Sequence, residues 1–174
     1  MITAKHLSYY GSRIITIYVS PRHLPAIIDV DVESDLDIVT FSLFGTSAEY
    51  QQNQSVELYG ATDSMVKELA TPCWGNFEED PSTIAVNLGV TCKGGNTAPS
   101  NSQSAANSGV HSGFTMLGLD IEGDGDKALV VSILSFNSMN LLVNSGDATT
   151  ANIGSQDITF PANFDNTDAI DVYT

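Results

Sequence analysis

The feature that most constrains the fold is a run of acidic residues at positions 29–37. It reads Asp-Val-Asp-Val-Glu-Ser-Asp-Leu-Asp, which places five carboxylates within nine residues. Because like charges this close repel one another, the run needs a compensating cation or full solvation. If it were extended, the acidic side chains would point to one face and the apolar ones to the other. Oxygen ligands at alternate positions of a short loop are typical of a calcium site. The predicted ligands are Asp29, Asp31, Glu33, Asp35 and Asp37.

A second acidic run begins 91 positions later and repeats the first. Each run leads into an apolar segment, at 38–44 and at 129–134, that predicts a β-strand. Asn53 and Asn144 keep the same spacing of 91. Several matches in one register are the signature of a repeat architecture. The predicted ligands of the second run are Asp120, Glu122, Asp124 and Asp126.

The two runs differ at the positions that shape and complete a calcium loop. The first has Val32 and Ser34 where the second has Gly123 and Gly125. The second has Ala128 at the ninth position, where a carboxylate is expected. Losing that carboxylate removes charge and oxygen ligands from the second run. The alternative for each run is a solvated acidic turn, and calcium is expected in the first loop more than in the second.

These segments resemble the FG-GAP/VCBS-type calcium-loop repeats of integrin-α-like β-propellers, in the long-insert form of large secreted proteins from Bacteroidota-type bacteria. The resemblance rests on 25–41 and 119–131, with Cys73-Trp74-Gly75 and Ser135-Phe136-Asn137, and covers roughly 14–161. It implies an all-β fold of four-stranded antiparallel blades, no enzymatic activity, and an extracellular or cell-surface location. Two acidic loops supply only part of a ring, so we expect a partial or multi-chain propeller.

We expect one domain, because 174 residues are typical of a single core. Repeat A would span about 14–92 with a cysteine-containing insert, and repeat B about 110–174. Between them, 93–109 is a low-complexity stretch rich in Gly, Asn and Ser, which predicts an exposed loop.

The apolar pattern predicts strands along most of the chain and at most one short helix. The helix is expected at Asp63–Leu69, with Asp63 as its N-cap. Expected strands are 13–20, 26–28, 38–44, 47–53, 83–90, 114–119, 129–134, 139–144, 157–160 and 169–173.

The charge balance excludes some partners. The chain has 21 acidic and 6 basic residues, a net charge of −15. Nucleic acids and anionic membranes attract clustered Lys and Arg, so neither is an expected partner. No apolar run reaches the ~18 residues that a spanning helix needs. Met1 is followed by no signal-peptide pattern, so a secretion signal would lie outside this sequence.

Two cysteines, Cys73 and Cys92, flank an apparent hairpin. In an oxidising compartment we expect them to pair, which would contribute about 3 kcal/mol; a reduced, buried pair is the alternative. Zinc is not expected with two Cys and three scattered His.

No catalytic motif stands out. His6, His23 and His111 lie in no arrangement with a nucleophile and an orienting acid. Trp74, the only Trp, is either a sugar-stacking platform or, as we expect, a packing anchor. Asn53 starts an N-glycosylation sequon, and Ser64 fits a loose O-glycosylation pattern.

The sequence therefore predicts a calcium-binding structural or adhesion module of a secreted or cell-surface bacterial protein, which is not an enzyme. Its expected partners are neighbouring blades, copies of itself, or a surface glycan or protein. One alternative is a subunit of an extracellular filament built by strand pairing between chains. Another is a carbohydrate-binding domain.

Overall fold

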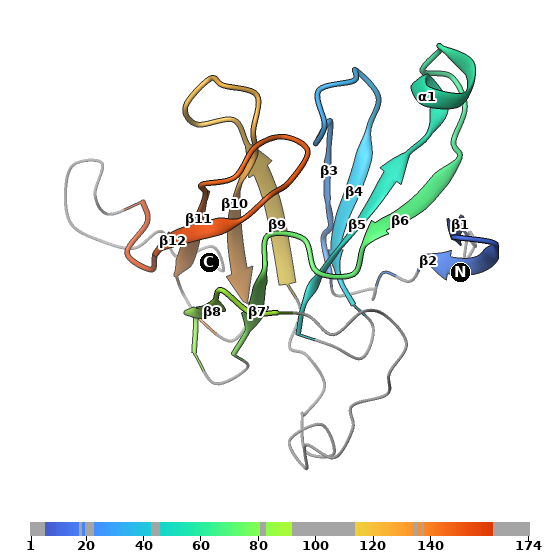
Figure 1. The fold of residues 1–174 in the computed structure, drawn as a ribbon. Helices are drawn as coiled ribbons and strands as arrows, with labels where there is room; N and C mark the ends of the chain where they lie inside the picture. The colour runs from blue at the N-terminus through green and yellow to red at the C-terminus, as the bar shows by residue number, and fades with distance from the viewer. Residues whose placement is uncertain are drawn as a thin grey trace.

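The computed structural model describes residues 6–17, 19, 23–42, 46–80, 83–91, 114–133, 136 and 138–161. Across these residues the chain forms three β-sheets and one short helix (Figure 1). The predicted all-β class is confirmed. None of the three sheets closes on itself within the described part of the chain.

The first sheet has six strands in the order β2-β1-β6-β5-β4-β3. Its last four strands in the chain, β3 to β6, form an antiparallel meander. A β1–β2 hairpin extends this meander, because β1 pairs with β6 in parallel. The strands are β1 (His6–Tyr10), β2 (Arg13–Ile17), β3 (Ala26–Ile28), β4 (Asp37–Phe41), β5 (Ala48–Asn53) and β6 (Lys67–Thr71).

The second sheet is another antiparallel meander of four strands, in the order β12-β11-β10-β9. A separate β7–β8 hairpin follows β6 in the chain and confirms the hairpin expected after Cys73. The strands are β7 (Phe77–Glu79), β8 (Val86–Leu88), β9 (Phe114–Leu119), β10 (Ala128–Ile133), β11 (Met139–Asn144) and β12 (Ile153–Asp157).

The two meanders share strand order and, in part, the spacing seen in the sequence. The bounds of β5 and β11 are 91 positions apart at both ends. The spacing breaks before the fourth strand, because the first meander inserts α1 (Ser55–Tyr59) and a further loop between β5 and β6. In the second meander a shorter connection joins β11 to β12.

The two meanders meet along their first strands, β3 and β9, which run side by side in Figure 1. Leu24, just before β3, forms a parallel bridge with Thr115 of β9. Its N–H donates to the Phe114 carbonyl at 2.7 Å, and its carbonyl accepts from the Met116 N–H at 2.9 Å. Further along, the two strands are close enough that a Cβ on Gly118 would lie 2.1 Å from Ile28 Cδ1.

The core is apolar and joins all three sheets. Phe41 of β4 contacts Phe114 of β9 at 4.8 Å between ring centroids and Phe77 of β7 at 6.3 Å. The alternating pattern of the strands supplies the rest, because inward residues come at every second position. Buried apolar side chains of this core include Val39, Tyr50, Trp74, Met116, Leu129, Val131, Leu142 and Ile153.

Several predicted elements are wrong. The helix expected at Asp63–Leu69 is absent; α1 ends before it, where Gly60 adopts a left-handed φ of 64°, and β6 begins at Lys67. Pairing with both β5 and β1 outweighs the weak helical period there. The last described strand is 153–157 instead of 157–160, and the expected 83–90 strand is reduced to 86–88. Strands β1 and β7 were not predicted.

Some predictions fall outside the described residues: the 93–109 loop, Cys92, His111 and the 169–173 strand. Within the described ranges, no helix has the length and apolar character that crossing a bilayer requires.

Candidate metal centre

The first acidic loop brings three of its predicted ligands together. Carboxylate oxygens of Asp29, Asp31 and Asp37 all lie within 4.8 Å of one another. Asp29 follows β3 and Asp37 opens β4, so the two strands hold the ends of the loop. Three carboxylates this close repel one another unless a cation or a proton lies between them.

The loop reaches this arrangement by bending sharply, so the extended alternation expected for it is wrong. Val32 has φ 65° and Ser34 has φ 76°, which is left-handed backbone. Of the apolar residues only Val30 is buried, while Val32 and Leu36 are exposed. A left-handed conformation at a β-branched residue costs about 1–3 kcal/mol and persists only where the surroundings impose it.

Asp29 stabilises the bend by accepting hydrogen bonds from its backbone. Its two carboxylate oxygens accept from the backbone N–H groups of Glu33 at 3.1 Å and Ser34 at 3.0 Å. The strained backbone therefore points its donors toward the carboxylate instead of leaving them to solvent.

Asp37 anchors the loop to the sheet. Its side chain is fully buried. One oxygen accepts from the Asn53 N–H at 2.7 Å, and the other accepts from the Val30 N–H at 2.9 Å and the Tyr50 hydroxyl at 3.2 Å. Burial nevertheless raises the pKa of Asp37 from 3.8 to about 6, because it outweighs the backbone donors of Asn53 and Val30.

Asp31 lies beside Asp37 and is short of donors. Its Oδ2 accepts from the Gln52 side-chain amide at 2.6 Å and from the Tyr50 hydroxyl at 3.1 Å, while its buried Oδ1 has no hydrogen-bond partner. Tyr50 faces both carboxylates but carries one hydroxyl proton, so it cannot donate to both at once. The pair is therefore under-compensated by the protein's own donors.

Lys67 is the cation on the sheet side of the loop. It is buried in β6, and its Nζ donates to the Leu36 carbonyl. Burial lowers the pKa of the Lys67 ammonium, although the charges of Asp37 and Asp35 act in the opposite direction. One ammonium offsets only part of the charge of five carboxylates.

The other two predicted ligands do not join the cluster. Glu33 is exposed and is not among the three converging carboxylates. Asp35 is buried, with 2% of its surface exposed; its Oδ2 accepts from the Val56 N–H at 3.3 Å and its Oδ1 has no hydrogen-bond partner. The described loop thus divides into a three-carboxylate cluster and a separate buried carboxylate that faces α1.

The second loop has the same bend without the cluster. Gly123 and Gly125 adopt φ of 75° and 96°, at the positions that correspond to Val32 and Ser34. Asp120 accepts from the N–H groups of these glycines at 2.6 and 3.1 Å. Asp29 likewise accepts from two backbone N–H groups of its own loop, of which Ser34 corresponds to Gly125. The predicted ligands of this loop do not form such a cluster: among the described residues, no three of their carboxylates come together as those of the first loop do. These predicted ligands are Asp120, Glu122, Asp124 and Asp126.

The sheet beneath the second loop explains this difference. At the spacing of 91, the counterparts of Asp37, Tyr50 and Gln52 are Ala128, Leu141 and Val143. Lys67 pairs with Asn53, and Ile153 pairs with Asn144 at the corresponding place in the second sheet. Four polar residues of the first loop and its sheet thus have apolar counterparts, while Asn53 keeps a polar one in Asn144. Tyr50, Gln52 and Lys67 were missed as site residues, although extending the comparison into the following strands would have found the first two.

Other predicted residues are placed by the structure as follows. Trp74 is 3% exposed and lies in the core, so its face is not available to a sugar. Asn53 is 4% exposed and its Oδ1 accepts from the Ser55 hydroxyl at 3.0 Å, which leaves no accessible amide for a glycan in the folded chain. Ser64 is partly buried. Because Cys92 lies outside the described residues, its pairing with Cys73 stays a prediction.

The donor set of the first loop fits a hard divalent cation. Carboxylate oxygens are the ligands that calcium prefers, and Asp29, Asp31 and Asp37 would hold it. The unpartnered Asp31 oxygen is the feature that a bound cation would satisfy.

Comparisons with protein-family models, curated proteins and solved structures found no match to this chain. The resemblance to calcium-loop repeats therefore stays an expectation from the sequence.

Proposed function

We propose that this chain is a non-enzymatic, extracellular β-sheet module of propeller type, stiffened by a calcium ion in the first acidic loop. The observation that carries the proposal is the convergence of Asp29, Asp31 and Asp37 within 4.8 Å, with Asp37 fully buried at the start of β4. Calcium would supply the positive charge that these carboxylates lack.

The role of the ion is mechanical. Asp37 accepts hydrogen bonds from three residues and so joins the loop to the sheet. Val30 is in the loop, and Asn53 and Tyr50 are in β5. A cation that holds Asp37 against Asp29 and Asp31 fixes the loop relative to β3, β4 and β5. The end of the sheet then becomes rigid, because its connections can no longer separate without losing the ion.

A propeller-type arrangement is supported by how the two meanders meet. Each has four antiparallel strands, and their first strands lie side by side, as the innermost strands of adjacent blades do. The FG-GAP/VCBS resemblance fits this arrangement. Further blades would come from more of the same chain or from other copies.

A structural or adhesive role outside the cell agrees with the strongly acidic composition, because free calcium is abundant there and would offset the charge. The filament alternative is supported by one observation: the outer strands β2 and β12 end their sheets within the described residues. Open edges can pair with a strand of another chain.

Thermal unfolding of the metal-free protein, with and without added calcium, tests the proposal. An ion that binds only the folded state stabilises it by RT ln(1 + [L]/Kd), which is about 2.7 kcal/mol at a hundredfold excess over Kd. We expect Asp31→Asn to abolish the increase in Tm. Asp124→Asn, which removes the same charge from the second loop, should retain it.

Absence of any calcium-dependent increase in the wild-type protein would refute calcium binding. Equal loss in both variants would point to general screening of acidic charge instead of a site in the first loop. Magnesium serves as the ionic control, because it prefers a smaller octahedral site and gives up its waters reluctantly.

A further inference from the structure

A sixth carboxylate, outside the acidic loop, lies next to the candidate site. Glu57 is on α1, which follows β5 and sits at the same end of the first sheet as the 29–37 loop (Figure 1). The Gln52 side-chain nitrogen donates to Asp31 at 2.6 Å and to Glu57 at 2.8 Å. The two carboxylates are therefore within two hydrogen-bond lengths of each other, joined by one amide.

A buried and unsatisfied oxygen lies on the side of the loop that faces α1. Asp35 is 2% exposed, and its Oδ2 accepts from the Val56 N–H of α1 at 3.3 Å. Its Oδ1 is buried without a hydrogen-bond partner, and so is the Oδ1 of Asp31, the carboxylate that Gln52 joins to Glu57. A buried carboxylate oxygen without a donor is a place where a cation would be favourable. Burial raises the pKa of Glu57, as do the nearby charges of Glu33, Asp31 and Asp35.

The corresponding connection in the second meander is satisfied by its own residues. Between β11 and β12, Asn144 accepts from the N–H groups of Gly146 and Asn152 at 3.0 and 2.8 Å. Asp147 accepts from Thr149 and Thr150. None of the hydrogen bonds described for this connection reaches the second acidic loop. Among the hydrogen bonds of the described residues, those that join such a connection to an acidic loop occur in the first meander.

The helix α1 has little to hold it in place by itself. It is five residues long. The Leu58 N–H donates to the Gln54 carbonyl, and the Gly60 N–H donates to the Val56 carbonyl. Helices this short are not stable in water without outside contacts. Its position therefore depends on its bonds to Asp35, to Gln52 and to Asn53 through Ser55.

We propose that Glu57 is a further ligand of the cation in the first loop, so that cation binding orders α1. Calcium takes six to eight oxygens, and the three loop carboxylates leave positions open for a ligand from outside the loop. Gln52 positions Glu57 by holding it beside Asp31. This inference rests on the proposed calcium site. It adds a ligand on α1, through which binding of the ion would order that helix.

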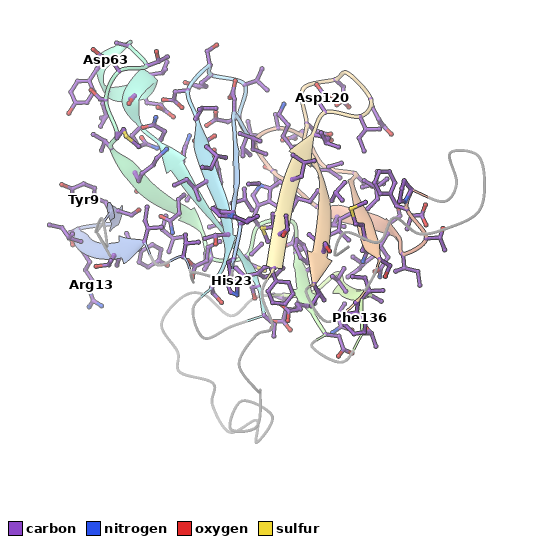
Figure 2. The ribbon with its side chains drawn as sticks, turned by 180° about the vertical axis from the view of Figure 1, so that it is seen from behind. Tyr9, Arg13, His23, Asp63, Asp120 and Phe136 are labelled. Carbon is purple, nitrogen blue, oxygen red and sulfur yellow. The ribbon has the colours of Figure 1, made fainter. Side chains whose placement is uncertain are left out.

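Calorimetric titration of the metal-free full chain with calcium tests the ligand. We expect Glu57→Gln, which keeps the shape but removes the charge, to weaken calcium binding about tenfold. Asp63→Asn is the matched control, because Asp63 is an exposed acid of the same β5–β6 connection, labelled near α1 in Figure 2. Screening of exposed charges should leave its affinity within about twofold of wild type.

Hydrogen exchange of the Leu58 and Gly60 amides supplies a second measurement. Protection of these amides should increase with calcium in the wild type and in Asp63→Asn, and should not change in Glu57→Gln. If wild type binds calcium and Glu57→Gln binds as tightly, the inference is wrong while the calcium site stands. Equal weakening in both variants also overturns it, since it would reflect only overall charge. No calcium binding in wild type removes the proposed function itself.

Discussion

The contact between Gly118 of β9 and Ile28 of β3 gives the sharpest test of how the two meanders are joined. A Cβ at Gly118 would lie 2.1 Å from Ile28 Cδ1, while Ile28 Cγ1 and Cγ2 would be 3.3 Å away. Gly118→Ala therefore overpacks this contact, at a cost of about 1–3 kcal/mol. Ile28→Val deletes the one carbon that clashes, and by itself should cost about 0.5–1.5 kcal/mol.

The double variant should be close to wild type, because the methyl group added at Gly118 takes the space of the deleted Cδ1. The two losses would then fail to add, and the coupling energy would approach their sum, about 1.5–3 kcal/mol. Urea denaturation at fixed calcium concentration measures all four free energies of unfolding. Ile27→Val is the control, since Ile27 is exposed on the same strand and should add independently to Gly118→Ala. Additivity of Gly118→Ala with Ile28→Val would refute the placement of β3 beside β9.

Two further predictions concern the first loop. In metal-free protein the pKa of Asp37 is about 6 in the folded state against an ordinary 3.8, so its stabilising contribution is complete below the lower value and is lost as pH rises through the higher one. Urea denaturation should show the free energy of unfolding falling by up to about 3 kcal/mol between about pH 4 and pH 7, and Asp31→Asn should reduce this fall because the Asp31 charge helps to raise that pKa; a rise over the same range would contradict the argument. Val32→Gly should increase stability by about 0.5–1 kcal/mol, because relief of the left-handed valine exceeds the added freedom of glycine in the unfolded chain; a decrease in Tm would show that the bend does not strain Val32.

The all-β class and most strands could be predicted because they depend on local alternation of apolar residues. The bounds of β5 came out within one residue, since Gly45-Thr46 separates this segment from the preceding strand in the sequence. The helix at Asp63–Leu69 failed for a non-local reason. Lys67 is buried at the start of β6, where its Nζ donates to the Leu36 carbonyl of the acidic loop. No pattern within 63–69 indicates this contact with a distant part of the chain.

The candidate site was only partly accessible to sequence reasoning. Spacing identified the carboxylates but could not separate the three that converge from Glu33 and Asp35, because that depends on the direction in which the loop bends. Residues on β5 and β6 complete the site, and they come close to the loop only when the sheet has formed. The convergence of carboxylates in the first loop and not in the second also depends on residues of the strands below the loops, which the acidic runs themselves do not include.

The matching left-handed bends in the two loops have a consequence for how such a module changes over time. Valine and serine hold the same backbone shape in one loop as two glycines hold in the other, so the shape survives without the residues usually required for it. In the proposed calcium site, affinity for the ion would then depend on the sheet surface below the loop. Substitutions at Ala128, Leu141 and Val143 could give the second loop the same affinity while the scaffold stays the same.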